Sequence, residues 1–175
     1  MIAVNAVTTY REGNMFWADA TDVVDVSTES AWESLDVLLM RIIEIPPVGG
    51  SSVKIRRVSN DVPVTFVGNK FLAQAAMLGG LIKTSLCMQV TDADPPRYLR
   101  LAIHTFNMHF ADADFRIESV ESRSRLTYRQ GFRSKSQSSG GPGVPIDVKA
   151  REMPETARIF NLWAAIAHTT ERTGV

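Results

Sequence analysis

A strand that runs directly into a helix is the feature that most restricts what this chain can fold into. Within Asp22–Leu35, Val24 and Val26 alternate with Asp25, which is the period of a half-buried strand. The serine and threonine that follow can cap a helix that carries Trp32 near its start. This junction predicts a domain that mixes a sheet with helices.

Composition limits the class of protein further. The chain has 175 residues, 45% of them apolar, which is enough for one domain with a substantial core. Lys plus Arg and Asp plus Glu both number 19, and this balance argues against a nucleic-acid partner. The single cysteine, Cys87, excludes an internal disulfide. No run approaches about 18 uninterrupted apolar residues, so we expect no membrane span. With no signal-peptide pattern at its start, we expect one domain over 1–175 in a cytoplasmic protein.

The remaining elements follow from apolar periodicity. The predicted strands and helices are an edge strand over 2–10, a long strand over 15–26, a helix over 29–45, strands over 53–58, 62–67, 86–91, 97–105, 110–120 and 124–133, and a helix over 154–172. We expect turns at 92–96 and 121–123. Residues 71–78 could form either a short helix or irregular structure, and their Ala, Met and Leu content favours the helix. Pro154 suits the first turn of the last helix. An antiparallel sheet with a helix across one face satisfies this order.

The connection to the last helix is rich in Ser and Gly. We expect a mobile loop over 134–153, in which the part up to Pro145 has few apolar anchors. Two interpretations stay open for this loop. It is either a gate that orders when a ligand enters or a disordered connector.

Three segments resemble one known superfamily. They are VVDVSTESAWESL at Val23–Leu35, DADPPRYLRLAI at Asp92–Ile103 and FRIESVESRSRLTYRQGF at Phe115–Phe132. Together with the closing helix they resemble the START/Bet v 1-like (SRPBCC) superfamily, which includes polyketide cyclases and dehydrases. The resemblance implies an α+β helix-grip fold, in which a curved antiparallel sheet wraps around a long C-terminal helix with a ligand cavity between them. Residues 46–50 and the long link over 134–153 depart from the superfamily pattern.

The resemblance implies function only at the level of a class. Members bind lipids, hormones or polyketides, and some catalyse aldol cyclisation and dehydration without a shared catalytic motif. One expectation is a cyclase or dehydratase that acts on a polyketide-like or other hydrophobic substrate by general acid–base catalysis. The alternative is a non-catalytic carrier or binding protein for a hydrophobic small molecule or lipid, and a third is an interaction module. We expect a hydrophobic ligand and neither a cofactor nor a metal, and a homodimer stays open.

Histidine is scarce, and strand parity distinguishes two of the three. If Leu101 and Ile103 face the cavity, His104 faces away, whereas counting back from Phe115 places His109 inside. The odd spacing of the two histidines on one strand makes them a poor metal pair. His109 is therefore either a pocket base or a structural histidine.

Two further polar residues are candidates for chemistry. Asp22 shares strand parity with Ala20 and Val24, although the opposite parity would turn Asp19 inward instead. A carboxylate on the cavity face could act as acid or base. Tyr128 could donate a hydrogen bond to a carbonyl or enolate oxygen. His109, Tyr128 and Asp22 are thus the catalytic candidates. The ligand-binding candidates are Trp32, Leu101, Ile103, Gln130, Phe160 and Trp163.

Overall fold

One antiparallel sheet and two helices make up the fold. The computed structural model describes residues 7–42, 52–57, 63, 65–77, 82–105, 108–133 and 146–173. The elements are β1 (Val7–Glu12), β2 (Met15–Val24), α1 (Thr28–Ile42), β3 (Ser52–Arg57), β4 (Lys70–Met77), β5 (Ile82–Asp94), β6 (Tyr98–Thr105), β7 (Met108–Val120), β8 (Arg123–Arg133) and α2 (Ile146–Thr173). The eight described strands lie in the order β1-β2-β8-β7-β6-β5-β4-β3.

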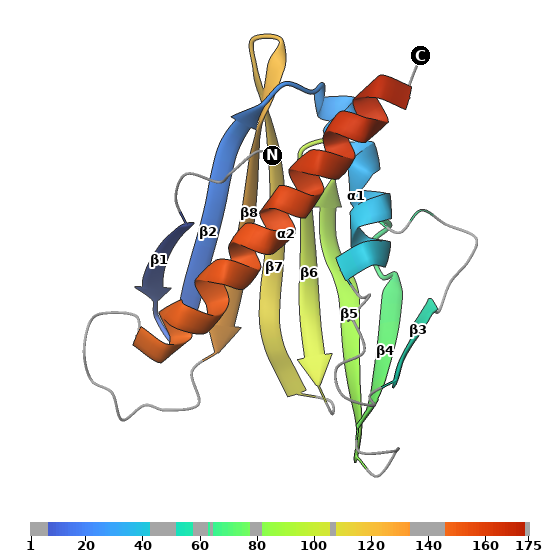
Figure 1. Cartoon of the computed structure of the whole chain (residues 1–175), viewed down its shortest axis with the longest axis vertical. Helices are drawn as coiled ribbons and strands as arrows, with labels where there is room; N and C mark the ends of the chain where they lie inside the picture. Colours follow the sequence, from blue (N-terminus) through green and yellow to red (C-terminus); the bar gives the residue numbers. More distant parts are fainter. Residues whose placement is uncertain are drawn as a thin grey trace.

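Helix α2 lies diagonally across one face of this sheet, and α1 lies beside it (Figure 1). Every neighbouring pair of strands is antiparallel. Strand β2 pairs with β8, so the first part of the chain closes against the last strand. The expected α+β helix-grip architecture, a curved antiparallel sheet with a long C-terminal helix, is confirmed.

The face of the sheet covered by α2 is called the inner face below, and the opposite one the outer face. Register aligns the inner-face side chains in rows across the strands, because opposed residues point the same way. One such row contains Leu99, Phe115, Tyr128, Ala20 and Val7. The first four of these are buried in the main core together with the sheet-facing side of α2.

The junction between β2 and α1 forms as expected. Ser27 caps α1, since its Oγ accepts a hydrogen bond from the Ser30 amide at 3.2 Å. The same hydroxyl donates to Glu171 of α2 at 2.7 Å. The start of α1 is therefore tied to the last turns of α2.

Residues 70–77 form strand β4, so the predicted short helix is wrong. The preceding turn docks on β5, where the Gly68 amide donates to the Val90 carbonyl and the Val90 amide to the Asn69 carbonyl. The chain therefore enters β4 already paired, and β3 pairs with its other side. This pairing outweighs the local helix propensity of alanine.

Three other expectations need correction. In the strand predicted over 62–67, the described residues Thr65, Phe66 and Val67 belong to a turn that ends at Gly68, whose φ is 90°. The turn predicted at 92–96 begins only at Pro95, because strand β5 continues to Asp94. Pro154 lies inside α2 rather than in its first turn, because the helix already begins at Ile146. The loop predicted over 134–153 thus ends before Ile146, and residues 134–145 lie outside the described residues.

Candidate functional site

A tyrosine and a glutamine form a polar pair on an otherwise apolar part of the inner face. Both project from β8, and Tyr128 is 2% and Gln130 9% exposed. The Tyr128 hydroxyl donates to Oε1 of Gln130 at 3.1 Å. This bond uses the side-chain oxygen of Gln130. The side-chain nitrogen of Gln130 is therefore the atom of the pair that would donate a hydrogen bond to a ligand.

Alanines flank this pair on both neighbouring strands. Register places Gln130 opposite Ala18 of β2 and Ala113 of β7. Ala20 and Ala111 occupy the adjoining inner-face positions, and all four alanines are buried. Gln130 therefore has only small side chains opposite it on both neighbouring strands.

Aromatic residues of β7 and α2 cover the neighbouring region. Phe115 packs against Tyr128 with ring centroids 4.9 Å apart and meets Trp163 edge-on at 5.2 Å. The indole Nε1 of Trp163 donates to Ser34 Oγ at 3.0 Å and points to the Ala31 carbonyl at 3.3 Å. These bonds fix α2 to α1, and Phe160 lies edge-on to Trp163 at 6.4 Å. The site is thus bounded by an aromatic wall whose position is set by both helices.

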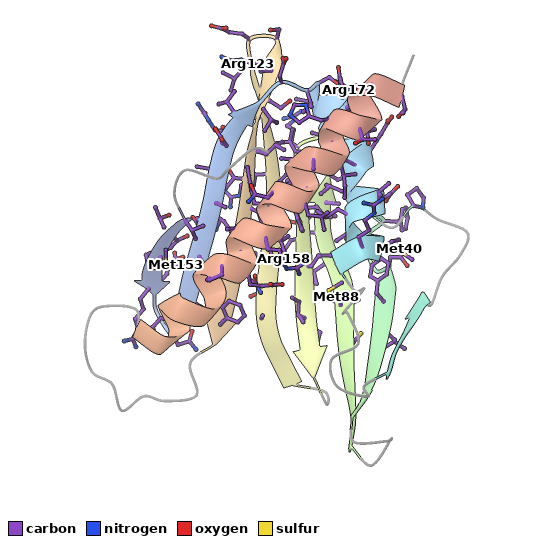
Figure 2. The ribbon with its side chains drawn as sticks, in the orientation of Figure 1. Met40, Met88, Arg123, Met153, Arg158 and Arg172 are labelled. Carbon is purple, nitrogen blue, oxygen red and sulfur yellow. The ribbon has the colours of Figure 1, made fainter. Side chains whose placement is uncertain are left out.

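A charged pair lies on α2 near the tyrosine. Arg158 donates two hydrogen bonds to the carboxylate of Glu155, at 2.8 and 2.6 Å, and both side chains are about half exposed. The bonds from Arg158 lower the pKa of Glu155, and the same bonds, aided by Tyr128, raise the pKa of Arg158. Figure 2 shows Arg158 where α2 passes over β8 and β7. The exposed side of α2 therefore carries an ion pair whose arginine interacts electrostatically with the buried phenol.

The structure brings most of the predicted ligand-binding residues to one side of the sheet. Leu101 is buried and Ile103 is partly buried, both on the inner face of β6. Phe160 and Trp163 are fully buried on the sheet-facing side of α2, whereas Trp32 of α1 is only partly buried against the core.

Asp22 has the inner-face parity, and Asp19 lies on the outer face. Register pairs Asp22 with the buried Leu126. The Asp22 carboxylate is half-buried and accepts the amide hydrogen of Val23 at 2.8 Å. This position is beyond the end of β1, whose pairing with β2 stops at Ala20. Asp22 therefore lies one row from the inner-face tyrosine, and its chemical role stays a prediction.

The pairing of β6 with β7, rather than alternation along a single strand, decides how His104 and His109 lie relative to each other. His104 of β6 is opposite Cys87 of β5, next to the inner-face Met88, so alternation places His104 on the outer face. A register shift follows Ile103, and it pairs His104 with His109 of β7. Opposed residues share a face, so this register does not support the inward orientation predicted for His109. The side chain of His109 lies outside those described, and its orientation stays a prediction.

The outer face carries an ionic ladder that the sequence analysis did not find. Its row alternates in sign across five strands: Asp19, Arg129, Asp114, Arg100 and Asp92. Arg100 Nε lies 3.2 Å from the carboxylate of Asp114, and Arg129 Nε lies 3.7 Å from that of Asp19. Burial raises the pKa of Asp114 and of Asp19, although the neighbouring arginines oppose this shift. Each of these residues comes from a different strand, and nothing in the sequence of one strand indicates which charged residues of the other strands will lie next to it.

Among the described side chains, no cluster of three or more His, Cys, Asp or Glu residues could hold a metal ion. Neither described helix is both long enough and apolar enough to cross a membrane.

The fold and this inner face define a Bet v 1-like helix-grip architecture, and comparisons with solved structures agree. Ara h 8.0201 superposes with a TM-score of 0.60 at 12% identity, over 89% of this chain and 99% of that one. A protein from Arthrobacter aurescens gives 0.60 at 17% identity, over 95% and 92% of the two chains. CalU16 from Micromonospora echinospora gives 0.52 at 11% identity, over 95% and 93%. No protein-family model matches the sequence, and no curated protein does. Identities this low establish the fold alone.

Proposed function

We propose that this protein binds a hydrophobic small molecule with a polar group in the space between the inner face and α2. The observation that carries the proposal is the buried Tyr128–Gln130 pair between alanines. An apolar surface with a few convergent polar groups is the usual form of a small-molecule site. The resemblance to a superfamily of ligand-binding proteins supports the same place.

Filling the space tests the proposal. We expect Ala113→Leu to abolish binding of β-methylnaphthalene and β-naphthol, followed by their fluorescence, without lowering the melting temperature. The added side chain would enter a space that a ligand otherwise takes. The matched control is Ala102→Leu, the same change on the outer face of the adjacent strand, which should leave probe binding intact.

The opposite outcome is equally clear. If the inner face is already closely packed, Ala113→Leu overpacks it and lowers the free energy of unfolding by about 1–3 kcal/mol. Such a loss, combined with no probe binding by the unmodified protein, would remove the binding proposal. An interaction module would then be the better interpretation.

Cyclase or dehydratase chemistry is a second candidate, and the Tyr128–Gln130 pair favours it. The Tyr128 hydroxyl, which donates to Gln130 in the structure, would give up that bond to donate to a developing enolate, and the Gln130 amide nitrogen would donate to the same ligand. In this candidate His109 is the base, and Asp22 is a further acid or base.

Turnover of a linear tetraketone, followed by the absorbance of the cyclised product, tests this chemistry. We expect His109→Ala to lower the rate by at least ~10²-fold, the lower end for general acid–base catalysis. Unchanged turnover in a folded His109→Ala variant would remove His109 from the mechanism. Probe binding without any turnover would favour the carrier.

A further inference from the structure

Helix α2 carries a buried hydroxyl that no hydrogen bond accounts for. Thr156 is 0% exposed, and its Oγ1 has no hydrogen-bond partner among the described residues. An unpaired buried hydroxyl costs free energy, so its presence needs a reason.

The other threonines of α2 make this one unusual. A threonine inside a helix can bond back to the carbonyl four residues earlier. Thr169, Thr170 and Thr173 all do so, each at 3.1 Å, to Ala165, Ile166 and Thr169 respectively. Thr156 lacks such a bond, so its hydroxyl is available to a partner outside the helix.

Helical spacing directs Thr156 toward the sheet. Phe160 follows it by four residues and Trp163 by seven, so the three share one face of α2. All three are 0% exposed, and the latter two belong to the main core. Thr156 therefore lies on the central line of the sheet-facing side.

Between Met153 and Arg158, α2 crosses from β1 and β2 to β8, the strand that carries the polar pair (Figure 2). Figure 2 shows Met153 over β1 and β2 and Arg158 over β8 and β7. Thr156 follows Met153 by three residues and precedes Arg158 by two. The contacts of α2 with β1, β2 and β8 agree.

We propose that Thr156 is a ligand-binding residue that, together with Gln130, selects hydrophobic ligands bearing a hydroxyl or carbonyl oxygen. The Gln130 amide nitrogen donates from the sheet, and the Thr156 hydroxyl donates or accepts from the helix. The inference rests on the proposed function and adds the chemical class of the ligand. A site built to bond an oxygen rejects an analogue that lacks it, because its polar groups then stay unpaired.

Two probes of nearly the same shape test this selectivity. β-Naphthol has a hydroxyl where β-methylnaphthalene has a methyl group. We expect Thr156→Val, which replaces the hydroxyl by a methyl, to weaken β-naphthol binding by about fivefold, the effect of one net hydrogen bond. Binding of β-methylnaphthalene should stay the same or improve. Thr156→Ser keeps a hydroxyl and should retain the preference for β-naphthol.

Controls separate this inference from the proposed function. Thr170→Val removes a hydroxyl that is already bonded to the Ile166 carbonyl and should leave both affinities unchanged. If Thr156→Val weakens both probes equally, or neither, the role of Thr156 in selectivity is overturned while ligand binding stands. If neither probe binds the unmodified protein, the proposed function itself fails. The free Thr156→Val protein should also melt no lower than the unmodified protein, since the lost hydroxyl had no partner.

Discussion

At the scale of single residues, the outer face has a close contact that depends on one glycine. A Cβ at Gly131 would lie 2.6 Å from the ring of Trp17, so the indole lies directly over the glycine backbone. The Arg129 guanidinium stacks 4.4 Å from the centre of the same ring. Trp17 is thereby 6% exposed although it points away from the main core. Sequence alternation alone would place this tryptophan with the exposed side chains.

Asp114 on the outer face should make the free energy of unfolding depend on pH. Its side chain is 3% exposed, and burial raises the pKa of its carboxyl above the ordinary value despite Arg100, Arg129 and Arg116. A raised pKa in the folded protein means that protonation favours folding. This contribution is present below the ordinary Asp pKa and is lost as pH rises through the raised value.

Replacing Asp114 by asparagine should remove that contribution. We expect the free energy of unfolding of the unmodified protein, relative to Asp114→Asn, to rise as pH falls from neutral toward the ordinary Asp pKa of about 4. Urea unfolding at a series of pH values measures this difference. Parallel pH profiles for the two proteins would contradict it and would indicate that the arginines cancel the effect of burial.

At the scale of elements, the two helices are joined by a specific polar contact as well as by apolar packing. Trp163 of α2 donates to Ser34 of α1, and Ser34 Oγ in turn donates to the Ala31 carbonyl at 2.7 Å. All of these groups are buried. The contact therefore sets how α2 is positioned over the sheet. It also positions the side of α2 that would face a ligand in the proposed site.

Trp163→Phe should weaken this contact while keeping an aromatic ring against Phe115. We expect the free energy of unfolding to fall by about 1–3 kcal/mol, because buried acceptors lose their donor. Ser34→Ala should cost less in the Trp163→Phe background than alone, with a coupling of about 0.5–3 kcal/mol in chemical denaturation. Additive losses would mean that the indole nitrogen and Ser34 act independently.

At the scale of the whole molecule, the two faces of the sheet have different chemistry. The inner face is apolar except for a few polar groups under α2, whereas the outer face carries alternating Asp and Arg side chains. Ligand binding is therefore proposed for the inner face alone. A single domain over 1–175, a homodimer and a cytoplasmic location stay predictions.

Much of the architecture was predictable from local patterns. The period of two predicted β2, β6, β7 and β8 nearly residue by residue, and the period of helical residues predicted most of α1 and the last part of α2. Tyr128 and Gln130 share strand parity with the buried Leu126, and both lie on the inner face. These features depend on residues that are close together in the chain, so they can be predicted from the sequence alone.

Other features of the fold depend on contacts between segments far apart in the chain, and only the tertiary structure shows them. Residues 70–77 became a strand because β3 and β5 pair with them on both sides. A register shift, invisible in either strand alone, placed His104 opposite His109. The ladder around Asp114 and the unpaired hydroxyl of Thr156 likewise arise only when strands and α2 meet. Sequence alone determined which residues share a face, whereas pairing and packing, which depend on distant partners, determined which of those faces meet.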